Sequence, residues 1–149
     1  MYIDMNIEEK FMREALKQAK KAASMGEMPV GAVIVHNGKI IARGYNKRET
    51  KKNALLHAEV TAIDKACRRL GGWRLPECEM YVTLEPCPMC AAAIGWAQIR
   101  RIVIGAADPK RGYTTMYAHS PFHPRAVVLQ GILADECAAV ITDFFRRRR

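Results

Sequence analysis

The sequence has no apolar run long enough to cross a membrane. Its longest apolar segments, such as 30–35, are only as long as a β-strand, whereas a membrane-spanning helix needs about 18 or more apolar residues in succession. Residues 1–9 include acidic side chains and lack the continuous apolar stretch of a signal peptide. We therefore expect a cytoplasmic protein that is not bound in a membrane.

Cysteine is sparse, and its count is odd. There are five cysteines in 149 residues, and two of them lie close together in Cys87-Pro-Met-Cys90. In a cytoplasmic chain this spacing favours a metal-binding or redox role over a framework of disulfides.

Acidic residues are in the minority, with 15 Asp and Glu against 24 Lys and Arg, so the net charge is +9. Basic residues gather near the ends of predicted helices and in the run 146–149. Such a surface suits a polyanion such as nucleic acid. On charge alone, a basic surface that only keeps the protein soluble remains an equal alternative.

The apolar half of the sequence is arranged in short periodic segments without internal repeats or linkers. Asn37-Gly38 is a strong signal for a two-residue hairpin turn. The order of segments predicts one α/β domain over 1–149, a three-layer α/β/α sandwich with a mixed sheet of about five strands. Helices are predicted over 7–24, 57–70, 88–97 and 134–145, strands over 30–36, 39–44, 80–84, 101–105 and 126–129, and irregular segments over 46–53 and 113–124.

Two short segments carry the residues best suited to bind a metal. His57 opens one predicted helix, while Cys87 and Cys90 lie on the first turn of another, where they can chelate one ion. A helix N-terminus also lowers the pKa of a thiol and so favours the thiolate. Because thiolate and imidazole suit zinc, we predict one Zn²⁺ per chain, held by these three residues with a fourth position open.

Glu59 is predicted to lie beside this metal, where it can take a proton from water and return it to a substrate atom. Alone, the cysteine pair could be a redox pair, or half of a structural zinc site completed by another ligand. Cys67, Cys78 and Cys137 are the other cysteines. Together with His57 and Glu59 the pair favours a catalytic zinc site, because a redox pair needs no His-x-Glu partner.

The two motifs resemble the signature of the cytidine deaminase superfamily, His-x-Glu followed by Pro-Cys-x-x-Cys. Within that superfamily the chain is most similar to the TadA-type bacterial tRNA-specific adenosine deaminases. The segments that carry the similarity are 28–33 (MPVGAV), 44–46 (GYN), 81–90 (YVTLEPCPMC), 105–110 (GAADPK) and 143–147 (DFFRR). They span nearly the whole chain.

This resemblance implies a reaction and a substrate pocket. Water would attack C6 of adenine while Glu59 moves a proton to the ring nitrogen and then to the departing ammonia, which leaves inosine. The substrate implied is the wobble adenosine of a tRNA anticodon loop. Asn46 matches a position that contacts the nucleoside, Val30 matches a wall of the base pocket, and the backbone around Leu84 and Glu85 is expected beside the metal.

The resemblance also implies partners. The basic C-terminal helix is expected to meet RNA phosphates through Phe145, Arg146 and Arg147, and the members of this group are homodimers. No membrane partner is implied.

Two other functions stay open at this point. Segments 53–56 and 113–125 depart from the pattern of the tRNA deaminases, and a remodelled loop over 113–125 could close on a small ligand. The second hypothesis is therefore deamination of a free nucleobase or nucleoside, such as guanine, adenine or cytosine. The third is a zinc-stabilised RNA-binding subunit without activity, against which Glu59 argues because binding needs no proton shuttle.

Overall fold

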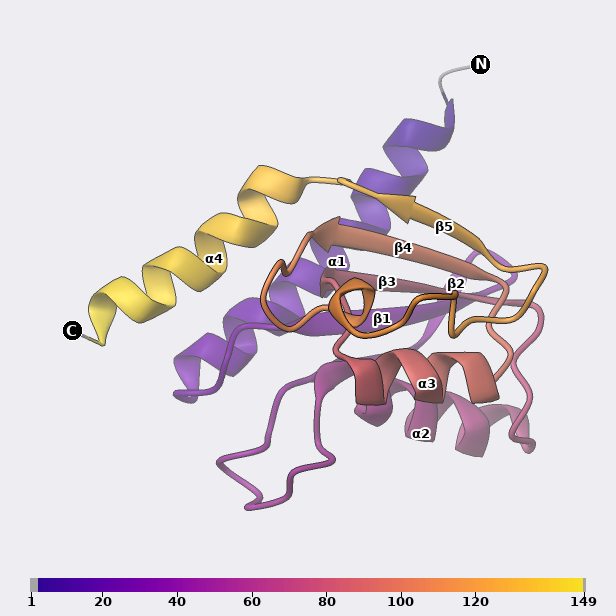
Figure 1. Cartoon of the computed structure of the whole chain (residues 1–149), viewed down its shortest axis with the longest axis horizontal. Helices are drawn as coiled ribbons and strands as arrows, with labels where there is room; N and C mark the ends of the chain where they lie inside the picture. The colour runs from indigo at the N-terminus through magenta and orange to yellow at the C-terminus, as the bar shows by residue number, and fades with distance from the viewer. Residues whose placement is uncertain (1–2, 149) are drawn as a thin grey trace.

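A computed structural model describes residues 3–148 of the chain (Figure 1). None of its helices is both long and apolar enough to span a membrane. The elements follow in the order α1 (Ile3–Ser24), β1 (Gly31–His36), β2 (Lys39–Tyr45), α2 (Ala58–Leu70), β3 (Cys78–Leu84), α3 (Pro88–Trp96), β4 (Arg101–Ala106), the short 3-10 helix η1 (Tyr113–Thr115), β5 (Val127–Gln130) and α4 (Ala134–Arg147).

The strands form one five-stranded sheet in the order β2-β1-β3-β4-β5. β1 pairs antiparallel with both β2 and β3, whereas β3, β4 and β5 are parallel. The hairpin between β1 and β2 turns at Asn37 and Gly38, which both have positive φ angles, of 51° and 75°. The prediction of a mixed sheet with a two-residue hairpin is therefore confirmed.

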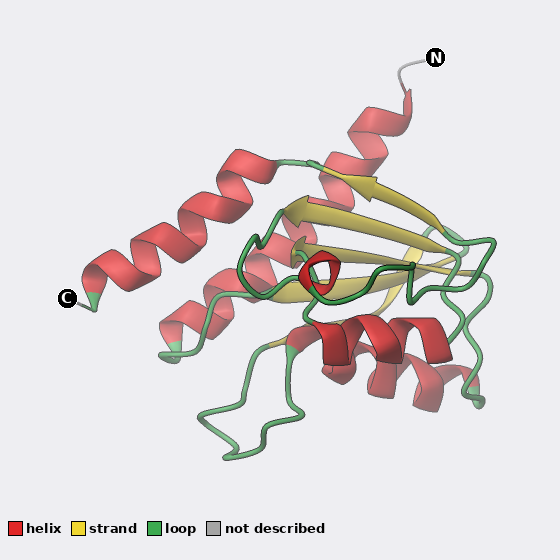
Figure 2. Cartoon of the chain, viewed as in Figure 1, coloured by secondary structure: helices red, strands yellow, loops and turns green. Residues whose placement is uncertain are grey.

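Helices cover both faces of the sheet, which confirms the three-layer architecture (Figure 2). α2 and α3 lie on one face, where Ala62 and Ile94 pack against alternate strand residues such as Ile34. α1 and α4 cover the other face, where Met12 and Cys137 pack in a second hydrophobic core with strand residues such as Val33. α1 begins four residues before the predicted start, because apolar periodicity marks a buried face and not the first turn of a helix.

Two glycines allow helices to rest directly on strands. A Cβ atom at Gly31 would lie 2.1 Å from the carbonyl oxygen of Ala15 in α1, and one at Gly44 would lie 2.3 Å from the carbonyl oxygen of Ala58. Real Cβ atoms do not approach so closely, so neither position accepts a side chain without moving a helix. The first turn of α2 is in this way seated on β2.

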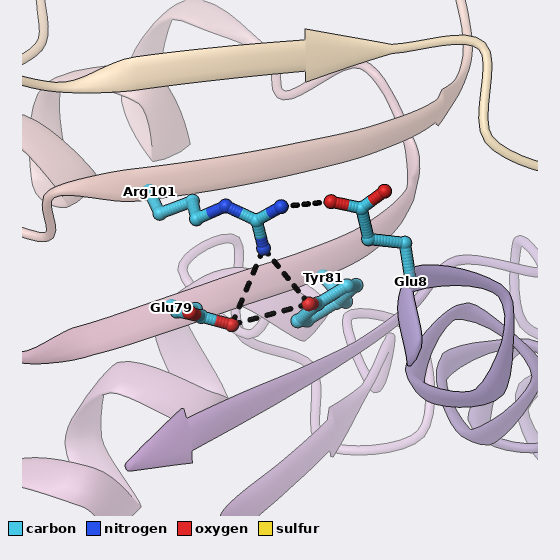
Figure 3. Close-up of polar contacts among 4 residues, drawn as sticks. All are labelled: Glu8, Glu79, Tyr81 and Arg101. Atoms are coloured by element: carbon cyan, nitrogen blue, oxygen red, sulfur yellow. Dashed lines mark hydrogen bonds and ion pairs between the residues drawn. The ribbon is translucent and has the colours of Figure 1, made fainter. Parts of the chain in front are cut away.

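A partly buried polar cluster ties α1 to the amino ends of β3 and β4 (Figure 3). The guanidinium of Arg101 forms an ion pair with Glu8 and donates to the hydroxyl of Tyr81 at 3.0 Å, while that hydroxyl donates to Glu79 at 3.1 Å. Burial and the neighbouring Glu79 raise the pKa of Tyr81. The cluster fixes α1 at the end of the sheet away from the site described next.

Candidate active site

The topology gathers four loops at one edge of the sheet. β3 and β4 are parallel, so their carboxyl ends lie at the same edge, and the antiparallel β1 contributes its amino end there. β2 ends beside the start of β1, since Gly31 pairs with Tyr45. In α/β proteins the carboxyl ends of parallel strands are where ligands usually bind.

Three potential metal ligands meet at this edge, at the starts of two neighbouring helices. His57 is the N-cap of α2, and Cys87 is the N-cap of α3, with Pro88 at the first helical position. The Nδ1 atom of His57 lies 3.6 Å from Sγ of Cys87 and 3.4 Å from Sγ of Cys90. All three ligand atoms lie within 4.8 Å of one another.

This spacing fits a zinc ion. Tetrahedral zinc, with bonds of about 2.3 Å to sulfur and 2.0 Å to nitrogen, separates a thiolate from an imidazole nitrogen by about 3.5 Å. Of the remaining cysteines, none joins the group among the described residues. Cys78 begins β3, Cys67 lies inside α2, and Cys137 is buried against Gly105. Three protein ligands leave a fourth position open, as catalytic zinc sites require.

The electrostatics of the two cysteines differ and favour a thiolate at Cys87. Hydrogen bonds with Cys90 and His57 lower the pKa of Cys87 to about 4, although burial opposes the change. The pKa of Cys90 is raised, first by its hydrogen bond with Cys87 and then by burial. Cys87 is thus a thiolate near neutral pH, and Cys90 keeps its proton until a cation displaces it.

Glu59 lies on the first turn of α2, where its side chain is buried, with 3% of its surface exposed. Burial raises the pKa of its carboxyl group to about 7. A carboxyl group that titrates near neutral pH can both accept and donate a proton under working conditions, which is what a general acid–base catalyst needs.

A pocket of about 510 Å³ opens directly onto these groups. His57, Glu59 and Cys87 form part of its lining. The other lining residues come from the loops at the sheet edge and from α4: Met28, Val30, Asn46, Arg48, Leu84, Glu85, Asp108, Lys110, Arg111, Ile141 and Phe145. A pocket of this volume can hold a single base with its sugar.

All four residues predicted to bind substrate lie in this pocket. Val30 and Asn46 are nearly buried and adjacent, since the backbone N–H of Asn46 donates to the carbonyl of Val30 at 3.3 Å. Leu84 ends β3. The carboxylate of Glu85, however, is engaged by the protein itself: it accepts hydrogen bonds from the backbone N–H groups of Asp108 and Thr114.

The three residues predicted to contact RNA do not share one surface. Phe145 lines the pocket, together with Ile141 one turn earlier on α4. Arg147 faces a separate groove of about 460 Å³ between α4 and the end of α1. Arg146 lies 3.8 Å from Asp143. The prediction of a basic run also named residue 149, which lies outside the described residues.

Sequence patterns missed the basic rim of the pocket. Arg48, Lys110 and Arg111 line it, yet in the sequence they stand in polar loops where charged residues usually face solvent. The one local signal is the run Asp108-Pro-Lys-Arg, whose aspartate side chain caps the backbone N–H groups of Lys110 and Arg111 at 3.2 and 3.0 Å. That signal predicts a turn, but it does not indicate that the turn borders a pocket.

Comparisons with known proteins agree with this site. Residues 5–106 match the family described as the cytidine and deoxycytidylate deaminase zinc-binding region. The tRNA-specific adenosine deaminase of Bacillus subtilis (strain 168) is 46% identical, over 97% of this chain and 92% of the relative.

Two solved structures are also similar. One comes from studies of A-to-I editing by tRNA:A34 deaminases at the wobble position; it has a TM-score of 0.80, is 41% identical, and is matched over 88% of this chain and 98% of the other. A guanine deaminase from Bacillus subtilis has a TM-score of 0.66 and 33% identity over 93% of each chain. With its His-x-Glu and Cys-x-x-Cys motifs brought together at one pocket, this chain belongs to the cytidine and deoxycytidylate deaminase family.

Proposed function

We propose that this protein is a tRNA-specific adenosine deaminase, which converts adenosine to inosine at the anticodon wobble position. One observation carries the proposal: a three-ligand metal group and a buried carboxylate lie together at a base-sized pocket, which His57, Cys87 and Glu59 help to line. The chain that holds them is similar over nearly its whole length to tRNA-specific adenosine deaminases.

His57, Cys87 and Cys90 would hold one Zn²⁺ per chain, which supplies the Lewis acidity that makes water a nucleophile near neutral pH. Glu59 would accept a proton as water adds to C6 of the adenine ring and pass it to the ring nitrogen. As the hydroxyl at C6 becomes a carbonyl, Glu59 would take its remaining proton and deliver it to the exocyclic nitrogen, so that the bond from C6 to that nitrogen breaks, ammonia leaves and inosine remains. The buried position of Glu59 and its raised pKa support this role.

Four residues would hold the adenosine. Val30 offers an apolar wall, and the side-chain amide of Asn46 can hydrogen-bond the nucleoside, because both residues line the pocket beside the metal group. Leu84 and the backbone at Glu85 line the same pocket and would extend the wall beside Val30, because β3 pairs with β1. The carboxylate of Glu85 would act indirectly, since it fastens the loop that carries part of the basic rim.

Basic side chains around the opening would bind the RNA backbone on either side of the flipped nucleotide. Arg48, Lys110 and Arg111 lie on the rim and would contact phosphates. Phe145 offers an aromatic ring that is 48% exposed and on which a base can stack. Arg146 and Arg147 would add salt-dependent affinity.

A homodimer is the assembly we propose, formed through the outer face of α3. α3 consists entirely of apolar residues and glycine, with a proline at its start, and a helix that is apolar on every side is normally buried. Here its outer face is open: Met89 is 36% exposed and Trp96 is 77% exposed. A second copy of the chain that covers this face would bury the ring of Trp96, as is common in interfaces.

We further propose that residues 1–149 act as one deaminase domain and that the protein works in the cytoplasm. All five cysteines are free, which supports a reducing compartment.

The two other hypotheses are less well supported. Similarity to a guanine deaminase leaves the chemistry unchanged, but the identity is 33%, against 46% for the tRNA-specific relative. An inactive RNA-binding subunit would have no use for a carboxylate buried beside the metal ligands.

Deamination of two substrate pools in parallel tests the proposal. Total tRNA is scored for inosine at position 34, and free adenine, guanine, cytosine and their nucleosides are scored for ammonia. We expect inosine in tRNA and no ammonia from the free compounds. Ammonia from a free base together with unmodified tRNA would overturn the proposal and establish the second hypothesis.

A further inference from the structure

Two lysines from distant parts of the chain lie against one tyrosine ring next to the pocket. The Nζ atom of Lys21, from α1, is 5.0 Å from the ring centroid of Tyr45, and the Nζ atom of Lys47 is 4.9 Å from the same centroid. Tyr45 ends β2 and is half-buried. An aromatic ring attracts cations through its face, and here it holds two like charges close together.

Lys65 of α2 adds a third positive charge beside this group, because its ammonium donates to the backbone carbonyl of Arg43, two residues before Tyr45, at 2.8 Å. Its pKa is lowered, first by burial and then by the charges of Lys47 and Lys21. Asp64 acts in the opposite direction on that pKa, but its carboxylate pairs with Arg68 at 3.2 Å. We name Lys21, Lys47 and Lys65 around Tyr45 the lysine cluster.

Within the described residues, no carboxylate lies within salt-bridge distance of any lysine of this cluster. Lys17 of α1 provides a contrast, because it pairs with Glu14 at 2.8 Å. Three elements thus bring positive charge together without any neutralising partner. Such an arrangement is unfavourable by itself and becomes favourable when an anion binds.

The cluster lies directly behind the pocket rim. Asn46 and Arg48 line the pocket, whereas Lys47, between them, points to the ring of Tyr45. Successive Cα atoms are about 3.8 Å apart. An RNA strand that places a nucleotide against Asn46 can therefore run its phosphate backbone past these lysines as it leaves the pocket.

We propose that the lysine cluster binds phosphate groups of the tRNA outside the nucleotide that enters the pocket. This inference rests on the proposed function and extends it, because it names a surface beyond the catalytic pocket. Lysine ammonium groups suit this task because they are point charges on flexible side chains, and they bind the phosphates of the RNA backbone without recognising its base sequence. The ring of Tyr45 holds the ammonium groups of Lys21 and Lys47 in place when no tRNA is bound.

Binding of total tRNA by the purified protein, measured at several salt concentrations, tests the proposal. The variant is Lys21→Gln/Lys47→Gln, and the matched control is Lys10→Gln/Lys39→Gln. The control removes the same charge at the other end of the sheet, where Lys39 follows the hairpin turn and Lys10 lies on the amino-terminal half of α1. Lys21→Arg/Lys47→Arg keeps the charge. Inosine formation is measured with each protein.

For the glutamine variant we expect a Kd for tRNA about tenfold higher at moderate salt, and a slope of log Kd against log salt smaller by about one for each lysine. The control and the arginine variant should resemble the unchanged protein, and kcat should be the same in all four.

Equal effects from variant and control would overturn the proposal and mark the lysines as part of a generally basic surface. A loss confined to kcat would also overturn it, since the lysines would then act only by positioning Asn46 and Arg48. If the unchanged protein bound tRNA without forming inosine, the proposed function would fail, while the salt slopes would still decide for or against the cluster.

Discussion

The carboxylate of Glu85 holds Thr114 by two hydrogen bonds, from the threonine hydroxyl at 2.7 Å and from its backbone N–H at 3.1 Å. A third comes from the N–H of Asp108. Glu85 stands two residues before Cys87, so this one side chain couples the metal-binding segment to the loop that borders the pocket. Gly112 lies so close that a Cβ there would approach Oε2 of Glu85 to 2.1 Å.

Replacing Glu85 should therefore damage the loop more than replacing its partner. In Glu85→Ala three donors lose their acceptor, and we expect a loss of about 2 kcal/mol or more in the free energy of unfolding, together with a higher KM for tRNA. Thr114→Val removes only the hydroxyl, at about 1 kcal/mol. Urea unfolding and tRNA kinetics give both quantities. Equal losses in the two variants would show that Glu85 does not organise the loop.

Changing Glu59 should separate catalysis from metal binding. Glu59→Gln keeps the shape of the side chain but removes its ability to exchange a proton, so kcat should fall by about 100- to 10,000-fold. The zinc content of the purified variant, measured by atomic emission, should stay at one ion per chain. Loss of zinc from this variant would mean that Glu59 is itself a ligand.

Buried Glu27 should make the stability of the fold depend on pH. Burial raises the pKa of its carboxyl group, but hydrogen bonds from Thr50 and the backbone N–H of Glu49 outweigh burial, and the net pKa lies below the ordinary value of 4.5. A lowered pKa stabilises the folded state above pH 4.5, and that contribution is lost as the pH falls through the folded-state pKa.

The difference in the free energy of unfolding between the unchanged protein and Glu27→Gln should accordingly be large at pH 7 and shrink below pH 4. Denaturant titrations at several pH values measure it. A difference that stays constant across this range would contradict an ionised Glu27 in the fold.

The arginines at the end of α4 should contribute to tRNA affinity without affecting chemistry. Arg146→Ala/Arg147→Ala should raise the KM for tRNA at low salt, with a smaller effect at high salt and an unchanged kcat. Arg68→Ala/Arg69→Ala is the matched control, because it removes two exposed arginines from α2 on the opposite face of the sheet. The role of Arg146 and Arg147 in RNA binding is excluded if the two double variants behave alike.

The sequence predicts most accurately what is encoded locally. The three ligand residues and Glu59 fall within two short motifs at predicted helix starts, and periodicity locates the neighbouring helices and strands. The pocket rim is different: Arg48, Lys110 and Phe145 come from three loops or helices that only the strand order brings together. The hydrogen bonds of the Glu85 carboxylate likewise depend on a loop more than twenty residues away. Such long-range contacts leave no periodic trace in a single sequence.

The absent side chain at Gly44 has a consequence for altering specificity. Because the backbone of Ala58 packs against this position, β2 sets how far the neighbouring His57 and Glu59 lie below the opening of the pocket. Gly44 itself belongs to neither motif. Variants that accept a different base can be sought at Val30 or in the loop 108–114, which border the opening. The start of α2 below them is held in one position by β2, and even one added methyl group at position 44 would displace it together with His57 and Glu59.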